Sequence, residues 1–200
     1  FALIVTSACV ALTVKFINEN PEFTDSDVYV MFRQDNNPAP FAAGYSGGHI
    51  ALTTAYSFAE LAGGVALSNT TSGLLYISLG TPMAVPVTNA SGQIPGPSPT
   101  DPTDPDYATR WGPVEVTFNG NASDVADLTG LNLFSIPILL KTYDGATLKQ
   151  TYGYHVDGNT MITKIKAAAT NDSAVIRDGS GSFVRVLGPV AYAAGTIGPY

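Results

Sequence analysis

Cysteine is nearly absent from this sequence, and its scarcity excludes two kinds of architecture. Cys9 is the one cysteine among 200 residues, so neither an intrachain disulfide nor a cysteine-based metal site can form. Cys9 lies in an apolar run, which favours a buried and unreactive thiol. The chain must therefore be stabilised by a hydrophobic core, and 200 residues are enough to build one.

Charged residues are also scarce. They make up 12% of the chain against 45% hydrophobic residues, and 9 Lys and Arg stand against 16 Asp and Glu. The formal net charge of −7 removes the phosphate attraction that drives nucleic-acid binding, so we expect no nucleic-acid partner. No apolar run approaches the roughly 20 residues that cross a bilayer, so we expect no membrane span. Neutral and cationic partners remain compatible with this charge.

Histidine is rare as well. His49 and His155 are far apart and lack the spacing of metal ligands, so we expect ordinary surface or hydrogen-bonded side chains and no metal site. Neither histidine has an obvious Ser or Cys partner, which argues against a nucleophilic triad. The sequence also lacks a phosphate-binding loop, and we expect no cofactor.

Turn residues and β-forming residues are abundant, with 20 Gly and 14 Pro. The apolar opening Phe1–Ala11 favours a strand. Leu12–Asn18 alternates apolar and polar residues and Val28–Phe32 is rich in β-formers, so these two segments are predicted to form a first hairpin. Further strands are predicted at Leu74–Leu79, Val114–Phe118, Leu131–Tyr143, Thr147–Tyr154 and Phe183–Leu187. The pattern predicts an all-β fold of antiparallel strands.

Two segments interrupt this pattern. Thr160–Ala169 predicts one short helix near residues 160–169, with Asn159 or Thr160 as its N-cap. Pro95–Pro105 holds five prolines, which exclude a helix or a sheet interior and predict a long surface loop over residues 95–113. Because the strands on both sides of this loop have the same character, residues 1–200 are predicted to form a single β-sandwich domain.

The composition suits a protein outside the cell. Few lysines and many Thr, Ser and Asn favour a secreted, extracellular or cell-wall location. Glycosylation sequons are compatible with a eukaryotic secretory pathway. The four candidate asparagines are Asn69, Asn89, Asn121 and Asn171.

The segment Arg110–Asn119 carries the most informative pattern. As a strand it would place Glu115, Thr117 and Asn119 on one face and the apolar residues between them on the other. A carboxyl, a hydroxyl and an amide in a row offer the donors and acceptors that sugar hydroxyls require, with Trp111 nearby as a stacking surface. The solvent-facing side of an ordinary antiparallel sheet has the same pattern, so both interpretations stay open.

Four segments resemble motifs of a known family. Ser72–Gly80 is similar to a Gly-Arg-Ile-Tyr-Ile-Ser element, and Asp101–Tyr107 is similar to Asn-Pro-Ser-Asp-Pro-Asn-Tyr. Val114–Phe118 resembles Val-Glu-Phe-Thr-Tyr, and Leu128–Ile138 resembles a strand containing Val-Asp-Phe-Phe-Ser-Ile-Pro. All four motifs belong, in this order, to glycoside hydrolase family 64, the laminaripentaose-producing type of β-1,3-glucanase.

The resemblance implies a fold and a site. It implies a thaumatin-like β-sandwich or barrel with a groove for β-1,3-glucan against a second α/β domain, which is expected to be absent or only begun where this chain ends. Family members are inverting hydrolases, which need a carboxylic acid to protonate the leaving oxygen and a carboxylate to activate water. By position, Glu115 matches the general acid, and Thr117, Asn119 and Thr129 match groove-lining polar positions.

The sequence departs from the family at the position of the base. Asn132 stands where the family has its base aspartate, and an amide cannot accept the proton of the attacking water. Asp124 or Asp127 in the adjacent loop would have to replace it.

Three hypotheses follow. The favoured one is an extracellular protein that interacts with β-1,3-glucan or a related polysaccharide and has impaired catalysis. The second is an active endo-β-1,3-glucanase. The third is a structural β-sandwich protein that self-associates. The low charge and the apolar N-terminus, which could add as a strand to a neighbour, are compatible with it.

Overall fold

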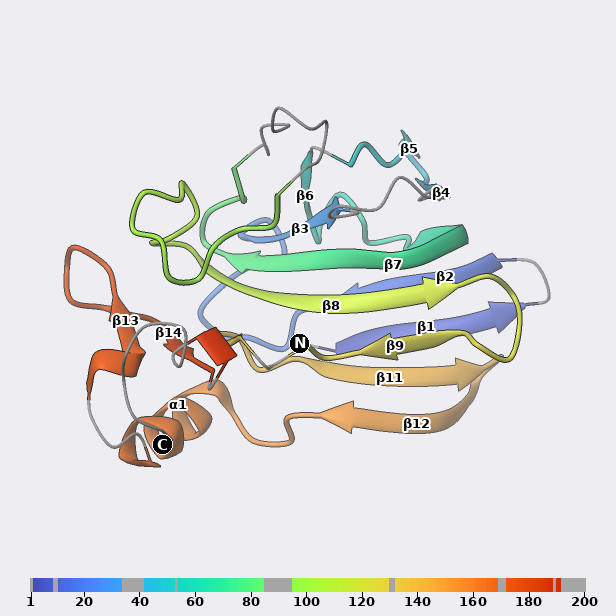
Figure 1. The fold of residues 1–200 in the computed structure, drawn as a ribbon. Coiled ribbons are helices and arrows are strands. Elements are labelled where there is room, and N and C mark those ends of the chain that lie inside the picture. Colours follow the sequence, from blue (N-terminus) through green and yellow to red (C-terminus); the bar gives the residue numbers. More distant parts are fainter. Residues whose placement is uncertain are drawn as a thin grey trace.

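Strands make up most of the regular secondary structure (Figure 1). The computed structural model describes residues 2–8, 11–33, 42–52, 54–84, 95–129, 132–168, 172–188 and 190–191. Its strands are β1 (Ala2–Ala8), β2 (Ala11–Ile17), β3 (Val28–Arg33), β4 (Ala42–Tyr45), β5 (Gly48–His49), β6 (Ala55–Ser57), β7 (Val65–Leu79), β8 (Arg110–Phe118), β9 (Val125–Asp127), β10 (Leu133–Phe134), β11 (Leu139–Asp144), β12 (Thr147–Gly153), β13 (Val175–Arg177) and β14 (Phe183–Leu187). The helix α1 spans Gly158–Ala168, and a 3-10 turn spans Asp172–Ala174. The predicted all-β fold class is confirmed.

Strand β7 joins two sheets because it belongs to both. Residues 65–67 pair with β2, whereas residues 74–79 pair with β3. One sheet therefore runs β12–β11–β1–β2–β7, with β4 on the other side of β7, and the second runs β6–β3–β7–β8–β9. A strand that changes sheets lets the two layers face each other across a common core. Every described pair is antiparallel except β1 and β11, which run parallel.

The main core lies between these two sheets. Val14 of β2, Val30 of β3, Leu67 of β7 and Val114 of β8 are among its fully enclosed side chains. Valine, leucine and isoleucine dominate because alternate strand positions face the neighbouring layer, where branched side chains pack well. This core holds β8 rigidly by its inner side and leaves its outer side available.

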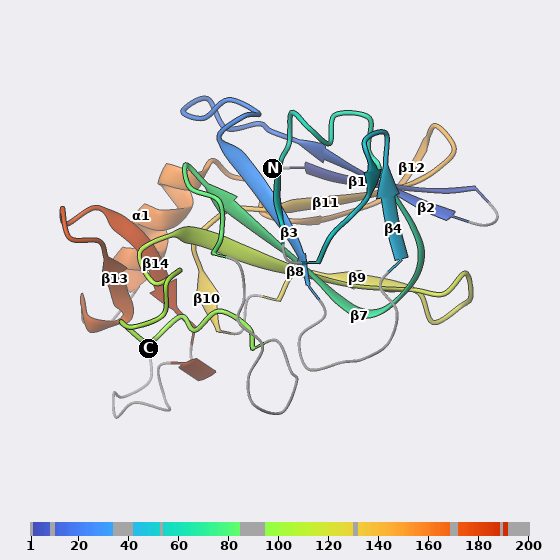
Figure 2. The same cartoon turned by 90° about the horizontal axis from the view of Figure 1, so that it is seen from above.

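A smaller unit packs at one end of the molecule. Figure 2 shows β13, β14 and α1 grouped there, while the turns joining β8 to β9 and β11 to β12 lie at the opposite end. Strands β10, β14 and β13 form a separate three-stranded sheet. Val175, Val186 and Leu187 lie in its own buried cluster, against which Ile165 of α1 packs.

Long-range pairing corrects one prediction. Strands β2 and β3 do not form a hairpin, because β2 pairs with β1 and β7, and β3 pairs with β6 and β7. The intervening loop crosses from one sheet to the other. A local apolar pattern identifies strands but not their partners, and this is why the sequence suggested the wrong pair.

Local details also differ from the predictions. The strand predicted over residues 131–143 is interrupted between β10 and β11, where Pro137 lies and cannot donate to a sheet ladder. Residues 110–113, predicted as loop, begin β8. Helix α1 starts before Thr160, and its cap is Asp157 in place of Asn159 or Thr160, since the Asp157 Oδ1 accepts the Thr160 N–H at 2.9 Å.

Some predictions fall outside the described residues, namely those for Cys9, Asn89 and Asn171. Asn69 lies in β7, and Asn121 is exposed in the turn between β8 and β9. Among the described residues, no helix has the length and apolar character needed to cross a bilayer.

Candidate functional site

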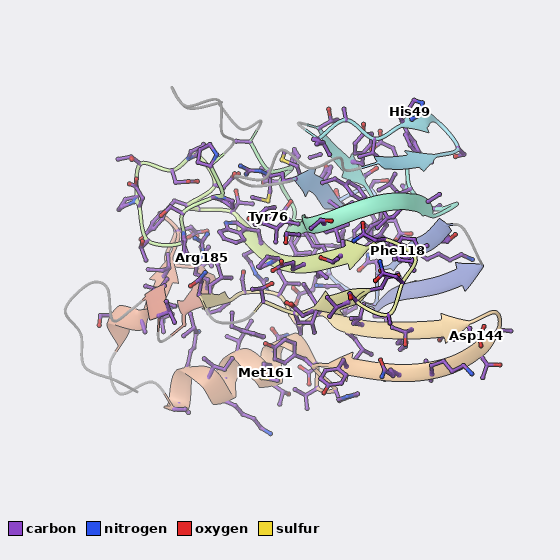
Figure 3. The ribbon with its side chains drawn as sticks, turned by 45° about the vertical axis from the view of Figure 1, so that its right-hand side comes forward. His49, Tyr76, Phe118, Asp144, Met161 and Arg185 are labelled. Atoms are coloured by element: carbon purple, nitrogen blue, oxygen red, sulfur yellow. The ribbon has the colours of Figure 1, made fainter. Side chains whose placement is uncertain are left out.

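Strand β8 turns alternate side chains inward and outward. Val114 and Val116 are 0% and 3% exposed, whereas Glu115 and Thr117 are partly exposed. Phe118, labelled in Figure 3 at the end of β8, closes the inward row at 7% exposure. Asn119 follows the strand and is exposed. The alternation predicted from the sequence is therefore present, with its polar side facing outward.

A bulge in β7 fixes the orientation of two of these polar side chains. The register between β7 and β8 shifts between Thr70 and Gly73, and Ser72 has a φ of 50°, in the left-handed region. The Ser72 N–H, released from the ladder, donates to Thr117 Oγ1 at 3.0 Å. Asn119 Nδ2 donates to Thr71 Oγ1 at 3.4 Å. The Thr117 hydroxyl still has its own proton to donate outward, so the bulge positions the polar row.

Asp127 lies directly opposite Glu115. The antiparallel pairing of β8 with β9 makes these two residues cross-strand partners, while Ala126 pairs with Val116 and packs toward the core. Directly opposed side chains share one face of a sheet, with Cβ atoms about 4.5–5.5 Å apart. Asp127 Oδ1 also accepts a hydrogen bond from Thr129 Oγ1 at 3.2 Å. Strand pairing thus places a second carboxylate, that of Asp127, opposite Glu115, and Thr129 is hydrogen-bonded to Asp127.

Asp124 is occupied by the turn between β8 and β9. Its carboxylate oxygens accept the backbone N–H groups of Asn119, Gly120 and Asn121 at 2.7, 3.0 and 3.1 Å. These three bonds hold the turn closed and use most of the roughly four acceptor sites of the carboxylate. Of the two acids considered as replacements for the base, Asp127 is therefore the one whose position faces Glu115.

Asn132 lies before β10, beside a small hollow. Its side chain is exposed, and its backbone carbonyl accepts the Gly188 N–H at 2.7 Å. The next residue, Leu133, lines a hollow of about 20 Å³ together with Pro113 and Thr129. Because Pro113 precedes Glu115 by two residues on β8, this hollow is at one end of the polar row.

Comparison with protein families decides the assignment. The family model described as beta-1,3-glucanase, glycoside hydrolase family 64, matches residues 20–198. The chain belongs to glycoside hydrolase family 64. A search among curated proteins gave no match.

Solved structures of this family share the fold. A β-1,3-glucanase domain from Clostridium beijerinckii superposes with a TM-score of 0.63 at 15% identity, covering 95% of this chain and 54% of that one. The laminaripentaose-producing β-1,3-glucanase from Paenibacillus barengoltzii, solved with laminarihexaose, gives a TM-score of 0.59 at 17% identity, covering 95% and 48%. The chain therefore spans about half the length of these structures.

Trp111, predicted as a stacking surface, belongs to the core. It is 3% exposed, its Nε1–H donates to the Asp106 carbonyl at 3.3 Å, and its ring packs edge-on against Tyr76 at 5.6 Å. The Arg185 guanidinium lies 5.2 Å from the same ring. The ring is covered on these sides and offers no platform to a sugar.

Arg185 organises the family-like segment that precedes β8. This fully buried side chain donates to the carbonyls of Pro99, Asp106, Tyr107 and Thr109 at 2.7–3.3 Å. Burial lowers the pKa of the Arg185 guanidinium to about 10, so it stays charged at neutral pH. We call this arrangement, Arg185 with the loop carbonyls and the Trp111 ring, the Arg185 hub; Figure 3 labels Arg185 and Tyr76 in this part of the molecule.

Burial also acts on Asp106 beside the hub. This side chain is 4% exposed and accepts the Ala84 N–H at 2.8 Å. Desolvation, the largest cause, raises the pKa of the Asp106 carboxyl together with the nearby Asp104 charge, against the hydrogen bond from Ala84 and the Arg33 and Arg185 charges, which lower it. Hydrogen bonds from Arg185 to four backbone carbonyls thus hold the segment before β8 in place.

A larger groove, which the sequence did not predict, opens beside Asp127. It has a volume of about 430 Å³ and lies between β9 and the β11–β12 hairpin. Thr142, Gln150 and Tyr152 line it opposite Asp127, and Tyr152 is 72% exposed. An aromatic residue at an alternating strand position was visible in the sequence. Nothing local showed that β9 would lie against that hairpin.

No metal site is evident in the residues that the structure describes. They contain no group of three or more His, Cys, Asp or Glu side chains close enough to hold an ion. His49 and His155 are both exposed.

Proposed function

We propose that this chain binds β-1,3-glucan through the outer face of β8 and β9, and that its hydrolytic activity is impaired. The observation that carries the proposal is the alignment of Glu115, Thr117 and Asn119 outside a rigid strand, with Asp127 and Thr129 beside them. Family membership supports the substrate class, since a relative was solved with laminarihexaose.

The pairing of Glu115 with Asp127 supports a functional role for this face. Like charges directly opposite each other in a sheet are unfavourable for folding. A purely structural surface gains nothing from two carboxylates at such a position, whereas a sugar-binding face uses them as acceptors for hydroxyl groups.

Impaired hydrolysis follows from the missing base. In the inverting reaction, Glu115 would give a proton to the leaving glycosidic oxygen while a second carboxylate takes one from water on the opposite face of the sugar. Asn132 is at the position of that second group, and its amide cannot accept the proton at neutral pH. The chain therefore retains the acid and the polar binding groups but lacks the family's base.

An active hydrolase is the second candidate, because Asp127 is paired with Glu115. The geometry does not favour this candidate. An inverting pair needs roughly 6.5–9.5 Å between its carboxyl groups to admit a water molecule. Directly opposed side chains begin about 4.5–5.5 Å apart at Cβ, so the two carboxyl groups must turn apart before water fits between them.

The self-associating structural protein is supported least. Strand β12 is one edge of its sheet, and β6 and β9 are edges of the other. On β12, a bulge opposite Thr142 and Tyr143 places Lys149 at the edge. A lysine and a bulge on an edge strand both discourage pairing with another chain. The predicted single-domain organisation and extracellular location remain proposals.

Sedimentation with insoluble β-1,3-glucan tests the proposal. We expect the purified chain to co-sediment, Glu115→Gln to retain binding because the amide keeps its size and hydrogen bonds, and Asn119→Ala to weaken binding. Asn159→Ala, an exposed asparagine in α1, is the matched control and should bind like the parent. Absence of binding by the parent chain would refute the proposal.

A reducing-sugar assay on laminarin separates the binder from the active hydrolase. We expect no turnover above background. Turnover that is lost in both Glu115→Gln and Asp127→Asn would establish the second candidate in its place.

A further inference from the structure

We propose that the groove between β9 and the β11–β12 hairpin is a saccharide subsite, with Tyr152 as the surface on which a sugar ring stacks. This inference rests on the proposed function and extends it, because it adds a second set of residues that contact the same neutral glucan. Residues of β9 line one side of the groove, and residues of β11 and β12 line the other side.

The groove has the construction of a ligand site. Its volume of about 430 Å³ falls in the common range of ligand pockets, roughly 300–1,000 Å³. Its floor includes Leu140, which is 4% exposed, and its rim includes Tyr152 at 72% exposure. Because the Tyr152 ring is so exposed to water, its contacts within the chain contribute little to stability. An aromatic ring beside an apolar floor offers the flat apolar contact that a pyranose ring requires.

The polar groups of the groove favour a neutral ligand with many hydroxyls. Thr142 and Gln150 are cross-strand partners on β11 and β12, so their side chains project together into the groove. A hydroxyl and an amide each donate and accept hydrogen bonds, and Asp127 accepts them. The lining contains no Lys or Arg, and its charged side chains are acidic, so an anionic ligand would be repelled.

Asp127 connects this groove to the face that carries Glu115. It is the cross-strand partner of Glu115 and also lines the groove. A chain bound along Glu115 and Thr117 therefore meets the groove at Asp127 without crossing an intervening strand, since β9 pairs with β8 and has no other strand partner among the described pairs. Because the Glu115 face and the groove meet at Asp127, we expect the ligand to be an oligosaccharide that is longer than the Glu115 face alone can hold.

Calorimetric titration of the purified chain with laminaribiose through laminarihexaose tests the subsite. We expect Tyr152→Ala to weaken laminarihexaose binding about five- to tenfold, the value of one lost stacking contact, and to reduce the gain in affinity with chain length. Tyr152→Phe keeps the ring and should remain within about threefold of the parent. Gln150→Ala should weaken the longer ligands by a smaller factor.

Two controls separate failure of this inference from failure of the proposed function. Leu148→Ala removes another exposed side chain of β12, 50% exposed and outside the groove, and should change no affinity. Asn119→Ala should weaken laminarihexaose binding through the Glu115 face. If Asn119→Ala weakens binding while Tyr152→Ala and Gln150→Ala do not, the subsite is refuted and the proposed function stands. If the parent chain binds no member of the series, both are refuted.

Discussion

The Arg185 hub and the outer face of β8 and β9 use polar residues in opposite ways. In the hub, one buried guanidinium donates to four backbone carbonyls, and the neighbouring Asp106 accepts a backbone amide. On the outer face, Glu115 and Asp127 oppose each other as like charges, and both belong to strands held from below by apolar packing. The hub pairs its guanidinium Nη1 and Nη2 groups with backbone carbonyls and leaves only the buried Arg185 Nε without a hydrogen-bond partner among the described residues, whereas the face leaves hydrogen-bonding capacity for a ligand.

This difference indicates which polar residues stabilise the fold and which are available for binding. A buried polar group that loses its partner costs about 1–3 kcal/mol, so changes in the hub should act on the free energy of unfolding. Changes on the face should act mainly on glucan binding, and some should stabilise the protein, because functional groups are often placed at a cost in stability.

The largest effect is expected for Arg185→Met. The substitution leaves loop carbonyls without their donor inside the protein, and we expect the free energy of unfolding to fall by at least about 3 kcal/mol. Urea denaturation measures it. Arg177→Met, at an exposed arginine of the neighbouring β13, should stay within about 0.5 kcal/mol of the parent. Equal stability of the two variants would show that the hub is dispensable.

Thr117→Val tests a polar residue that lies on the binding face and also accepts a hydrogen bond that stabilises the fold. Valine keeps the shape but leaves the Ser72 N–H in the β7 bulge without its acceptor, so we expect a loss of about 1 kcal/mol in the free energy of unfolding. Thr117→Ser retains the oxygen and should lose much less. If both variants unfold at the same urea concentration, the hydroxyl does not stabilise the bulge.

Asp127→Asn should raise the free energy of unfolding, whereas the two preceding substitutions lower it. It removes one of two like charges that are directly opposed on β8 and β9, and we expect a gain of about 0.2–1 kcal/mol in the free energy of unfolding. The same measurement in high salt should show a smaller gain, because salt screens exposed charges. A loss of stability would mean that Asp127 mainly supports the fold through its bond with Thr129.

The smallest effect is expected for Asp106→Asn, and it depends on pH. Burial raises the pKa of Asp106 in the folded state, so this group favours folding below its unfolded pKa and loses that contribution as the pH rises through the folded value. The variant should therefore gain stability relative to the parent as the pH rises from about 4 through the raised folded pKa. Denaturation midpoints of both proteins across this range measure the difference, and a constant difference would contradict the assignment.

The sequence predicted the strands more reliably than their partners. Period-two alternation depends only on the geometry of an extended backbone, so β2, β3, β8, β12 and β14 could all be placed within a few residues. Pairing depends on contacts between distant segments, so the proposed hairpin of β2 with β3 was wrong, and the shared role of β7 was not foreseen.

The features of the candidate site also fall into those that the sequence predicted and those that depend on strand packing. The polar row of Glu115, Thr117 and Asn119 could be identified from the chain alone, because strand alternation is a local property. The assignment of Asn132 to the base position rests on the family resemblance and stays a prediction. The carboxylate opposite Glu115, the burial of Trp111 and the groove at Tyr152 could not. Each depends on which strand lies beside or above another, and that is settled by the packing of two sheets around one core.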